Sequence, residues 1–171
     1  MNMKIVLYLA ITLNGYIAGE DDNVDWVYEG SWDNYLEKVK ESDVVVVGRR
    51  TYEIMSQEEF NAARHYAVFT SKRNIQLKAS NVEFVHITPK QFIEKLKKKR
   101  IVRKILVAGG SKLNSSFLKE NLIDEIYLDV EPFILGKGIP LFDRVDVKLR
   151  VKLLGCKVDN NTIQLHYKII K

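Results

Sequence analysis

Two strand–glycine–helix junctions hold the residues whose types and spacing are best suited to chemistry. Each begins with an apolar, β-branched run, residues 44–47 and 105–107, which is typical of a strand buried on both faces. Backbone N–H groups at the helix start that follows are unpaired and favour an anion. The first junction contributes Gly48, Arg49, Arg50 and Thr51, and the second contributes Ala108, Gly109, Gly110, Ser111, Lys112 and Leu113. Two such sites at the carboxyl ends of one sheet predict a crevice for a phosphate-rich ligand such as a dinucleotide.

Side chains at the first junction also suit phosphate. Arg49 or Arg50 can supply a bidentate fork for a terminal phosphate, and Thr51 can add a hydroxyl donor. The alternative is that both arginines are merely solvated on a surface helix and that the glycine pair is only a tight turn. We favour phosphate contact by at least one arginine, because the pair directly follows a glycine at a strand end.

The elements that must position these residues alternate between strand and helix and then become strands alone. We expect strands over residues 4–11, 44–47, 65–70, 82–86, 105–107 and 125–131, with a C-terminal hairpin formed by 147–154 and 162–170. The strictly alternating run 125–131 predicts a half-exposed strand. This order predicts an α/β fold with a mostly parallel central sheet and an antiparallel C-terminal hairpin.

Capping signals predict where two of the helices begin. Ser31 is the expected N-cap of a helix whose periodic face includes Trp32, Tyr35, Leu36 and Val39. Thr88 and Gln91 form a capping box that opens a helix to about residue 99. Residues 12–30 form a long polar loop, and its two hinge glycines and acidic tract 20–22 predict a mobile lid over the site.

Composition is that of one cytoplasmic enzyme domain over residues 1–171. The chain is 46% hydrophobic, enough for one substantial core, and no apolar stretch reaches the roughly 20 residues that span a bilayer. A signal peptide is not expected, because no small-residue cleavage site follows the apolar residues 5–11. The single Cys156 fits a reducing compartment, and the three histidines lack metal-ligand spacing, so no metal is expected.

The net charge of +5 comes largely from a basic run between Lys95 and Lys104. One interpretation is a solvated helix end, where cations complement the helix dipole. The other is a nucleic-acid patch. We favour the first, because no aromatic residues interleave with these charges.

Four segments together resemble the dihydrofolate reductase superfamily, on the branch of the C-terminal reductase domain of riboflavin-biosynthesis deaminase-reductases and their stand-alone relatives. They are Thr12–Ala18 after the first strand, the turn Val47–Glu53, the glycine-pair turn Ile105–Gly110 and the run Pro132–Phe142. The turn at Val47–Glu53 is the most specific of the four. The resemblance reaches across most of the chain and implies a dihydrofolate-reductase-like, three-layer fold.

The same resemblance implies NADPH as the cofactor and hydride transfer as the chemistry. It places Ala10 and Ile11 against the nicotinamide and Gly15 in the adjoining loop, and brings Thr70, Ser71 and Lys72 to the adenosine 2′-phosphate. The alternative for these last three residues is an ordinary polar turn. The substrate is then a small pterin- or pyrimidine-like molecule.

Reduction also needs a proton source, and the loop region offers Asp25 and Asp33. Asp33 is the preferred acid because it follows the expected N-cap, although helix-start electrostatics alone would explain it. At least one of Trp26 and Trp32 is expected to wall the substrate pocket.

Two further functions stay open. One is a stand-alone riboflavin-pathway enzyme with 5-amino-6-(5-phosphoribosylamino)uracil reductase activity. It is weakened because Ala108 stands where that branch tends to carry glutamate. The other is a non-catalytic nucleotide- or nucleic-acid-binding protein. For the reductase we also expect a homodimer, because Tyr127, Val130, Phe133 and Ile134 present apolar surface.

Overall fold

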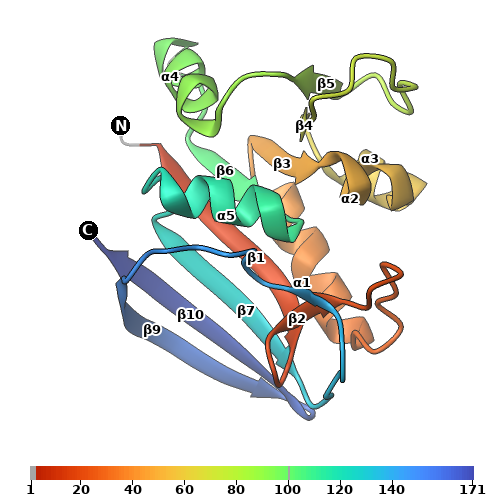
Figure 1. Ribbon diagram of the computed structural model, residues 1–171, viewed down its shortest axis with the longest axis vertical. Helices are drawn as coiled ribbons and strands as arrows, with labels where there is room; N and C mark the ends of the chain where they lie inside the picture. The colour runs from red at the N-terminus through yellow and green to blue at the C-terminus, as the bar shows by residue number, and fades with distance from the viewer. Residues whose placement is uncertain (1–2, 100) are drawn as a thin grey trace.

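A computed structural model describes residues 3–99 and 101–171 (Figure 1). The helices are α1 (Glu29–Lys40), α2 (Arg49–Ile54), α3 (Gln57–Ala62), α4 (Pro89–Lys99) and α5 (Ser111–Lys119). The strands are β1 (Lys4–Thr12), β2 (Tyr16–Ala18), β3 (Val44–Gly48), β4 (Tyr66–Phe69), β5 (Val82–Val85), β6 (Lys104–Val107), β7 (Glu125–Glu131), β8 (Ile139–Pro140), β9 (Arg150–Asp159) and β10 (Thr162–Ile170).

One eight-stranded sheet organises the molecule in the order β5-β4-β3-β6-β1-β7-β10-β9. The pairs from β5 through to β7 are all parallel, and β10 runs antiparallel to both β7 and β9. The predicted mostly parallel sheet with an antiparallel C-terminal hairpin is therefore confirmed. The carboxyl ends of the parallel strands meet at one edge, so residues that follow them are brought together there.

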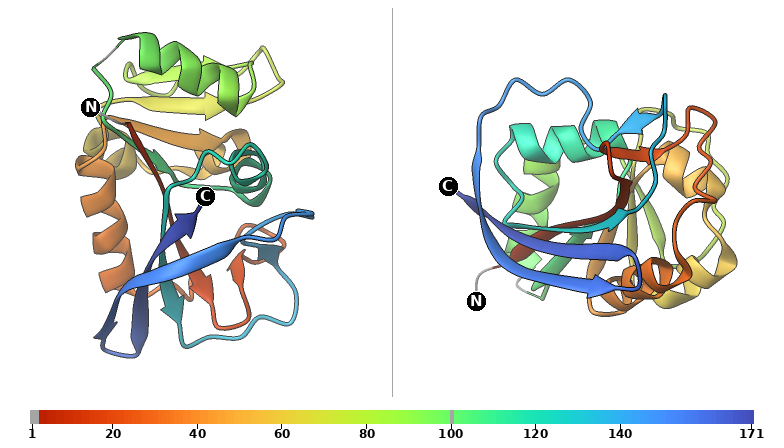
Figure 2. Two further views of the ribbon diagram at one scale, coloured as in Figure 1. Left: turned by 90° about the vertical axis from the view of Figure 1, so that its left-hand side faces the viewer. Right: turned by 90° about the horizontal axis from the view of Figure 1, so that it is seen from below.

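Alternating side chains along the buried strands build two separate cores, one on each face. Val44 and Val46 of β3 pack on the side of α4 and α5, whereas Val45 and Val47 pack on the side of α1, Tyr52 of α2 and α3. Figure 2 shows α1 and α5 on opposite sides of the sheet. Helices on both faces explain why these strands are apolar throughout, and the three-layer arrangement follows.

Several local predictions are confirmed and others are wrong. The capping box at Thr88 and Gln91 forms in both directions, with N···O distances of 3.1 and 3.3 Å. Ser31 is not the N-cap of α1. That helix begins at Glu29 after Tyr28, and Ser31 is its third residue, with a buried side chain. The loop 12–30 contains the short strand β2, and the hairpin begins at β9, which starts later and runs longer than expected.

Membrane-spanning helices and clustered metal ligands are both absent from the described residues. None of the helices there combines the length and the apolar character needed to cross a membrane. Within the same residues, His, Cys, Asp and Glu side chains do not gather in threes as a metal site would require.

Two buried tyrosines, Tyr8 and Tyr66, and the partly buried Tyr35 predict a stability limit at high pH. Burial raises the pKa of Tyr8, Tyr35 and Tyr66 above the usual value of 10. Above about pH 10 the unfolded chain loses these protons while the folded state keeps them, so the free energy of unfolding falls as pH rises. In a titration followed by absorbance at 295 nm and circular dichroism, we expect these three to ionise only as the protein unfolds. Ionisation of all eight tyrosines near pH 10 with an unchanged dichroism spectrum would contradict this.

Candidate active site

The two glycine junctions lie side by side because β3 and β6 are neighbouring parallel strands. The backbone N–H of Gly48 donates to the carbonyl oxygen of Gly109 at 2.8 Å. A Cβ placed on Gly48 would lie 3.6 Å from the backbone nitrogen of Gly110, so the two turns are in van der Waals reach. The fold therefore brings together the residues that the sequence singled out, while what they bind stays a prediction.

The start of α5 offers hydrogen-bond donors that the protein itself does not use. Its N-cap is Gly110, which has no side chain to accept from the first N–H groups. The Ser111 hydroxyl is buried and has no hydrogen-bond partner among the described residues. Gly109 has a φ of 98°, a conformation that glycine adopts without strain. These features fit a phosphate group held by backbone at the helix start.

Both junction arginines are engaged by carboxylates of the same chain. Arg49 Nη1 lies 2.6 Å from both oxygens of Glu53, one turn along α2. Arg50 pairs with Asp22 at 2.8 Å and also donates to the carbonyl oxygen of Glu20. The pair with Arg50 ties the acidic tract 20–22, part of the predicted lid, to α2. A phosphate at this arginine would have to compete with Asp22.

The residues after β4 lie one strand further along the same edge. The backbone N–H of Lys72 donates to the Thr70 hydroxyl at 3.0 Å, and a ring nitrogen of His86 lies 2.8 Å from the Thr70 carbonyl oxygen. Ser71 and Lys72 are exposed. The segment is an ordered polar turn with an exposed lysine side chain. This geometry is compatible with contact to a 2′-phosphate and with an ordinary polar turn, the two alternatives from the sequence.

The loop after β1 is clasped by the segment that follows β7. The side chain of Asn14 donates to the carbonyl oxygen of Leu135 at 2.7 Å and accepts from its N–H at 3.3 Å. The N–H of Leu141 donates to the carbonyl oxygen of Gly15, and β2 pairs with β8. Asn114 of α5 donates to the carbonyl oxygen of Leu141, which fixes this assembly next to the second glycine junction. Ala10 and Ile11 precede it at the end of β1.

The predicted acids and tryptophans are dispersed. Asp33 is the fifth residue of α1, not a first-turn residue, and its side chain is exposed. Asp25 is exposed and accepts from Asn23 at 2.6 Å. Trp26 stacks on Phe133 with ring centres 6.2 Å apart. Trp32 packs against Tyr35 instead, and both indoles are partly buried.

A buried polar cluster on β7 was missed by the sequence analysis. The alternation in β7 predicted an exposed polar face, yet Asp129 is 0% exposed and Glu131 is 1% exposed. Asp129 accepts hydrogen bonds from the Tyr8 hydroxyl, from Asn34 of α1 at 3.3 Å and from Gln164 of β10 at 3.1 Å. The polar face is thus covered by α1, and donors from three elements replace water around the carboxylate.

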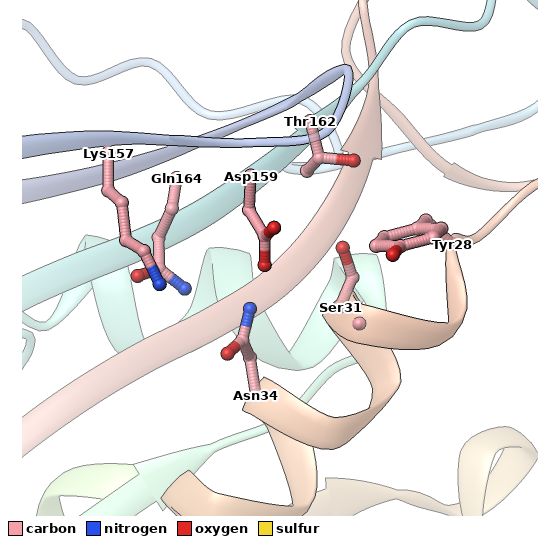
Figure 3. Close-up of a pocket in the computed structure, with 8 residues that line it drawn as sticks. Tyr28, Ser31, Asn34, Lys157, Asp159, Thr162 and Gln164 are labelled. Atoms are coloured by element: carbon pink, nitrogen blue, oxygen red, sulfur yellow. The ribbon is translucent and has the colours of Figure 1, made fainter.

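A shallow groove with no enclosed volume adjoins this cluster, between the first turns of α1 and the β9–β10 hairpin (Figure 3). It is lined by Tyr28, Gly30, Ser31, Asn34, Lys157, Asp159, Thr162 and Gln164. Thr162 also donates to Glu131 at 2.8 Å. Because Glu131 pairs in register with Thr12 of β1, the groove lies at the same strand edge as the junctions, on the other side of β1. A second hollow, lined in part by Lys152 and Lys168, lies at the opposite end of these strands.

Comparisons with known proteins agree with this geometry. The chain matches the RibD C-terminal domain family over residues 58–165. It is 35% identical over 173 residues to the uncharacterized protein YwjB of Bacillus subtilis (strain 168), covering 98% of each chain. The chain therefore belongs to the RibD C-terminal domain family, and the resemblance to the reductase branch of riboflavin biosynthesis is confirmed.

Solved structures show the same fold. A protein from Shewanella sp. PV-4 superposes with a TM-score of 0.82 at 24% identity, covering 99% of this chain and 100% of that one. A diaminohydroxyphosphoribosylaminopyrimidine deaminase/5-amino-6-(5-phosphoribosylamino)uracil reductase from Thermotoga maritima superposes with a TM-score of 0.77 at 19% identity. That match covers 98% of this chain and 57% of the Thermotoga protein. The family match identifies the chain as an oxidoreductase-type domain, and these neighbours show that it has the dihydrofolate-reductase-like fold.

Gly48→Ala tests whether the space between the junctions is a binding cradle. The added methyl group would meet its nearest atoms at 3.6 and 3.8 Å, so we expect the free energy of unfolding to change by less than about 1 kcal/mol. The methyl group would stand between the two turns, so binding of NADPH, the cofactor that the family resemblance implies, should weaken about tenfold or more in a fluorescence titration.

Gly155→Ala is the matched control for this substitution. Its Cβ would lie 3.9 Å from the Cβ of His166, on the hairpin away from the junctions, and it should leave NADPH binding unchanged. Equal affinities of the Gly48→Ala and wild-type proteins would show that the cradle does not hold the cofactor.

Proposed function

We propose that this protein is an NADPH-dependent reductase that transfers a hydride to a small pterin- or pyrimidine-like substrate. The observation that carries the proposal is the contact between the two glycine junctions, which sets the starts of α2 and α5 side by side at one strand edge. Membership of the RibD C-terminal domain family supports the same chemistry. The alternative substrate is the phosphoribosylated aminopyrimidine named for the Thermotoga neighbour.

The residues at the strand edge fit the parts of such a cofactor. In this proposal, the backbone N–H groups that follow Gly110 and the unpartnered Ser111 hydroxyl receive the pyrophosphate. Arg50 and Lys72 meet the 2′-phosphate, and the nicotinamide lies against Ala10 and Ile11 at the end of β1. When bound, NADPH supplies the hydride.

The proton source is proposed separately. Asp33 and Asp25 are exposed in the free protein, so each would need the loop before α1 to close over the substrate before it could act. Trp26 lies in this loop and packs on Phe133, so closure should be visible in its fluorescence.

The basic run offers less support to a nucleic-acid function. Lys97, Lys98 and Lys99 occupy the last turn of α4, where cations complement the helix dipole. Lys104 pairs with Glu41 at 2.6 Å. Arg100 lies outside the described residues.

The cofactor preference tests the reductase proposal. NADPH should bind roughly tenfold or more tightly than NADH, because a charge-assisted contact to the 2′-phosphate is worth about 1.5–3 kcal/mol. Asp22→Asn removes the carboxylate that competes for Arg50 and keeps a residue type that tolerates the positive φ of 67° at this position. This variant should therefore bind NADPH about two- to fivefold more tightly.

Arg50→Ala supplies the opposite change and should weaken NADPH without affecting NADH. Lys119→Ala, an exposed substitution in the last turn of α5, is the control. Equal affinity of the wild-type protein for NADPH and NADH would contradict the assignment of this edge to the 2′-phosphate.

We also propose that the protein is a homodimer, joined through the C-terminal hairpin. Of the apolar surface expected from sequence, Phe133 is 44% exposed and Ile134 is 67% exposed, whereas Tyr127 is covered by His166, with ring centres 3.9 Å apart. Further exposed apolar residues lie on the edge strand β9, where Leu153 is 51% exposed and Val158 is 66% exposed. A ten-residue edge strand with unpaired backbone groups and apolar side chains is a template for pairing.

Light scattering at micromolar concentration should return twice the chain mass of 19.8 kDa. Leu153→Lys with Val158→Lys should shift the mass to that of one chain, and Lys157→Ala on the same strand should not. A monomeric wild-type protein would exclude this interface.

A further inference from the structure

We propose that the hollow between the start of β9 and the end of β10 is a second binding site, which takes the phosphate monoester of a small organic molecule. The hollow has a volume of about 400 Å³ and is lined by Asp124, Lys152, Lys168, Ile169, Ile170 and Lys171. Figure 1 shows this end of β10 on the left, beside the start of β1, and α2 with the first glycine junction on the right. A ligand in the hollow would therefore be distinct from the cofactor of the proposed reductase.

The first observation is a pair of lysines that face each other across the hollow. Lys168 of β10 and Lys152 of β9 are partners in the antiparallel register, so both side chains leave the same face of the sheet. Both are exposed, and neither has a carboxylate within 4.0 Å among the described residues. Like charges directly opposite each other on neighbouring strands repel and destabilise the pair. A dianion held between the two ammonium groups would replace this repulsion by attraction.

The second observation is that the nearest carboxylate of β7 is already engaged. Glu125 is the register partner of Lys168 on the other side of β10. It accepts a hydrogen bond from Lys4 at 2.7 Å, and its second oxygen lies 3.0 Å from a ring nitrogen of His166. Both oxygens of Glu125 thus have partners elsewhere, and the positive charge at Lys152 and Lys168 stays uncompensated.

The carboxylate on the wall of the hollow is engaged in the same way. One oxygen of Asp124 pairs with Lys171 at 2.7 Å, and the other accepts the backbone N–H of Ile5 at 2.8 Å. The wall therefore carries three ammonium groups and one carboxylate, which leaves a surplus of two positive charges. A phosphate monoester carries about −1.5 to −2 charge at pH 7, which matches this surplus.

The hollow also offers more than a bare ion needs. Its volume lies within the range of small-molecule sites, roughly 300–1,000 Å³. Ile169 is buried and Ile170 is 52% exposed, so the lysines stand beside apolar side chains. A phosphate group between Lys152 and Lys168 would leave the carbon skeleton of the ligand against Ile170.

The hollow is separate from the proposed dimer contact. Successive side chains of a strand point to opposite faces, so Lys152 leaves β9 on the face opposite to Val151 and Leu153. A dimer contact built on Leu153 would therefore use the other face of the hairpin at this point.

The test uses glycerol 3-phosphate, with glycerol as its uncharged counterpart, and protein labelled at the isoleucine methyl groups. Each compound is titrated at constant ionic strength, with and without saturating NADPH, and followed by NMR. We expect glycerol 3-phosphate to shift the methyl signals of Ile169 and Ile170 in a saturable manner under both conditions. Glycerol should shift neither signal.

Lys152→Glu separates the stability of the hairpin from its binding function. It places opposite charges in register, so the melting temperature should rise by roughly 1–3 °C, while glycerol 3-phosphate should bind at least tenfold more weakly. Lys157→Glu is the matched control, because it makes the same change in net charge on β9 at a position opposite Gln164 and outside the hollow. It should bind glycerol 3-phosphate as the wild-type protein does.

Three results would each overturn the proposed phosphate site. They are the absence of a saturable shift, equal shifts with glycerol, and an equal loss of affinity in the two glutamate variants. Competition between glycerol 3-phosphate and NADPH would also overturn it, because the two sites lie at opposite ends of the sheet. None of these results bears on the proposed reductase, which is tested by NADPH binding itself.

Discussion

The hydrogen bond from the Gly48 N–H to the Gly109 carbonyl oxygen is the contact on which the candidate site depends. It joins the ends of two neighbouring parallel strands and so fixes where both following helices begin. Gly109 has no room for a side chain without strain, because its φ is positive and a Cβ there would lie 3.2 Å from the Leu9 side chain, whereas a Cβ on Gly48 would meet its neighbours at 3.6 and 3.8 Å. The donors of α5 therefore face outward at a place that the sheet itself determines.

The site divides at β1 into two halves with opposite electrostatics. On the β3 and β6 side, backbone N–H groups and Arg50 favour anions. On the β7 and β10 side, Asp129 and Glu131 favour hydrogen-bond donors. The clasp between Asn14 and Leu135 holds the end of β1 between them. In the proposed reductase, this division would keep a phosphate-rich cofactor on the β3 and β6 side of β1.

The sequence predicted the two glycine junctions better than the buried polar cluster on β7, for physical reasons. Buried parallel strands and glycine turns leave local patterns, so the junctions at Gly48 and Gly109 could be located directly. The buried state of Asp129 and Glu131 depends on α1 and β10, which are distant in sequence, and alternation alone predicted exposure. Ser31 was predicted as the N-cap of α1 because of its residue type, but the helix begins two residues earlier, at Glu29. Helix α3 was not predicted, although the sequence contains its capping box, formed by Ser56 and Glu59.

The proposed placement of the cofactor can be tested directly by crystallography. A crystal structure of the protein with NADP⁺ should show the pyrophosphate within hydrogen-bond distance of the backbone nitrogens of Gly110 and Ser111, and the nicotinamide beside Ala10. The groove lined by Ser31 and Asn34 should remain free of the cofactor. Cofactor density in that groove, or at the lysine-lined hollow near Lys152 and Lys168, would contradict the account.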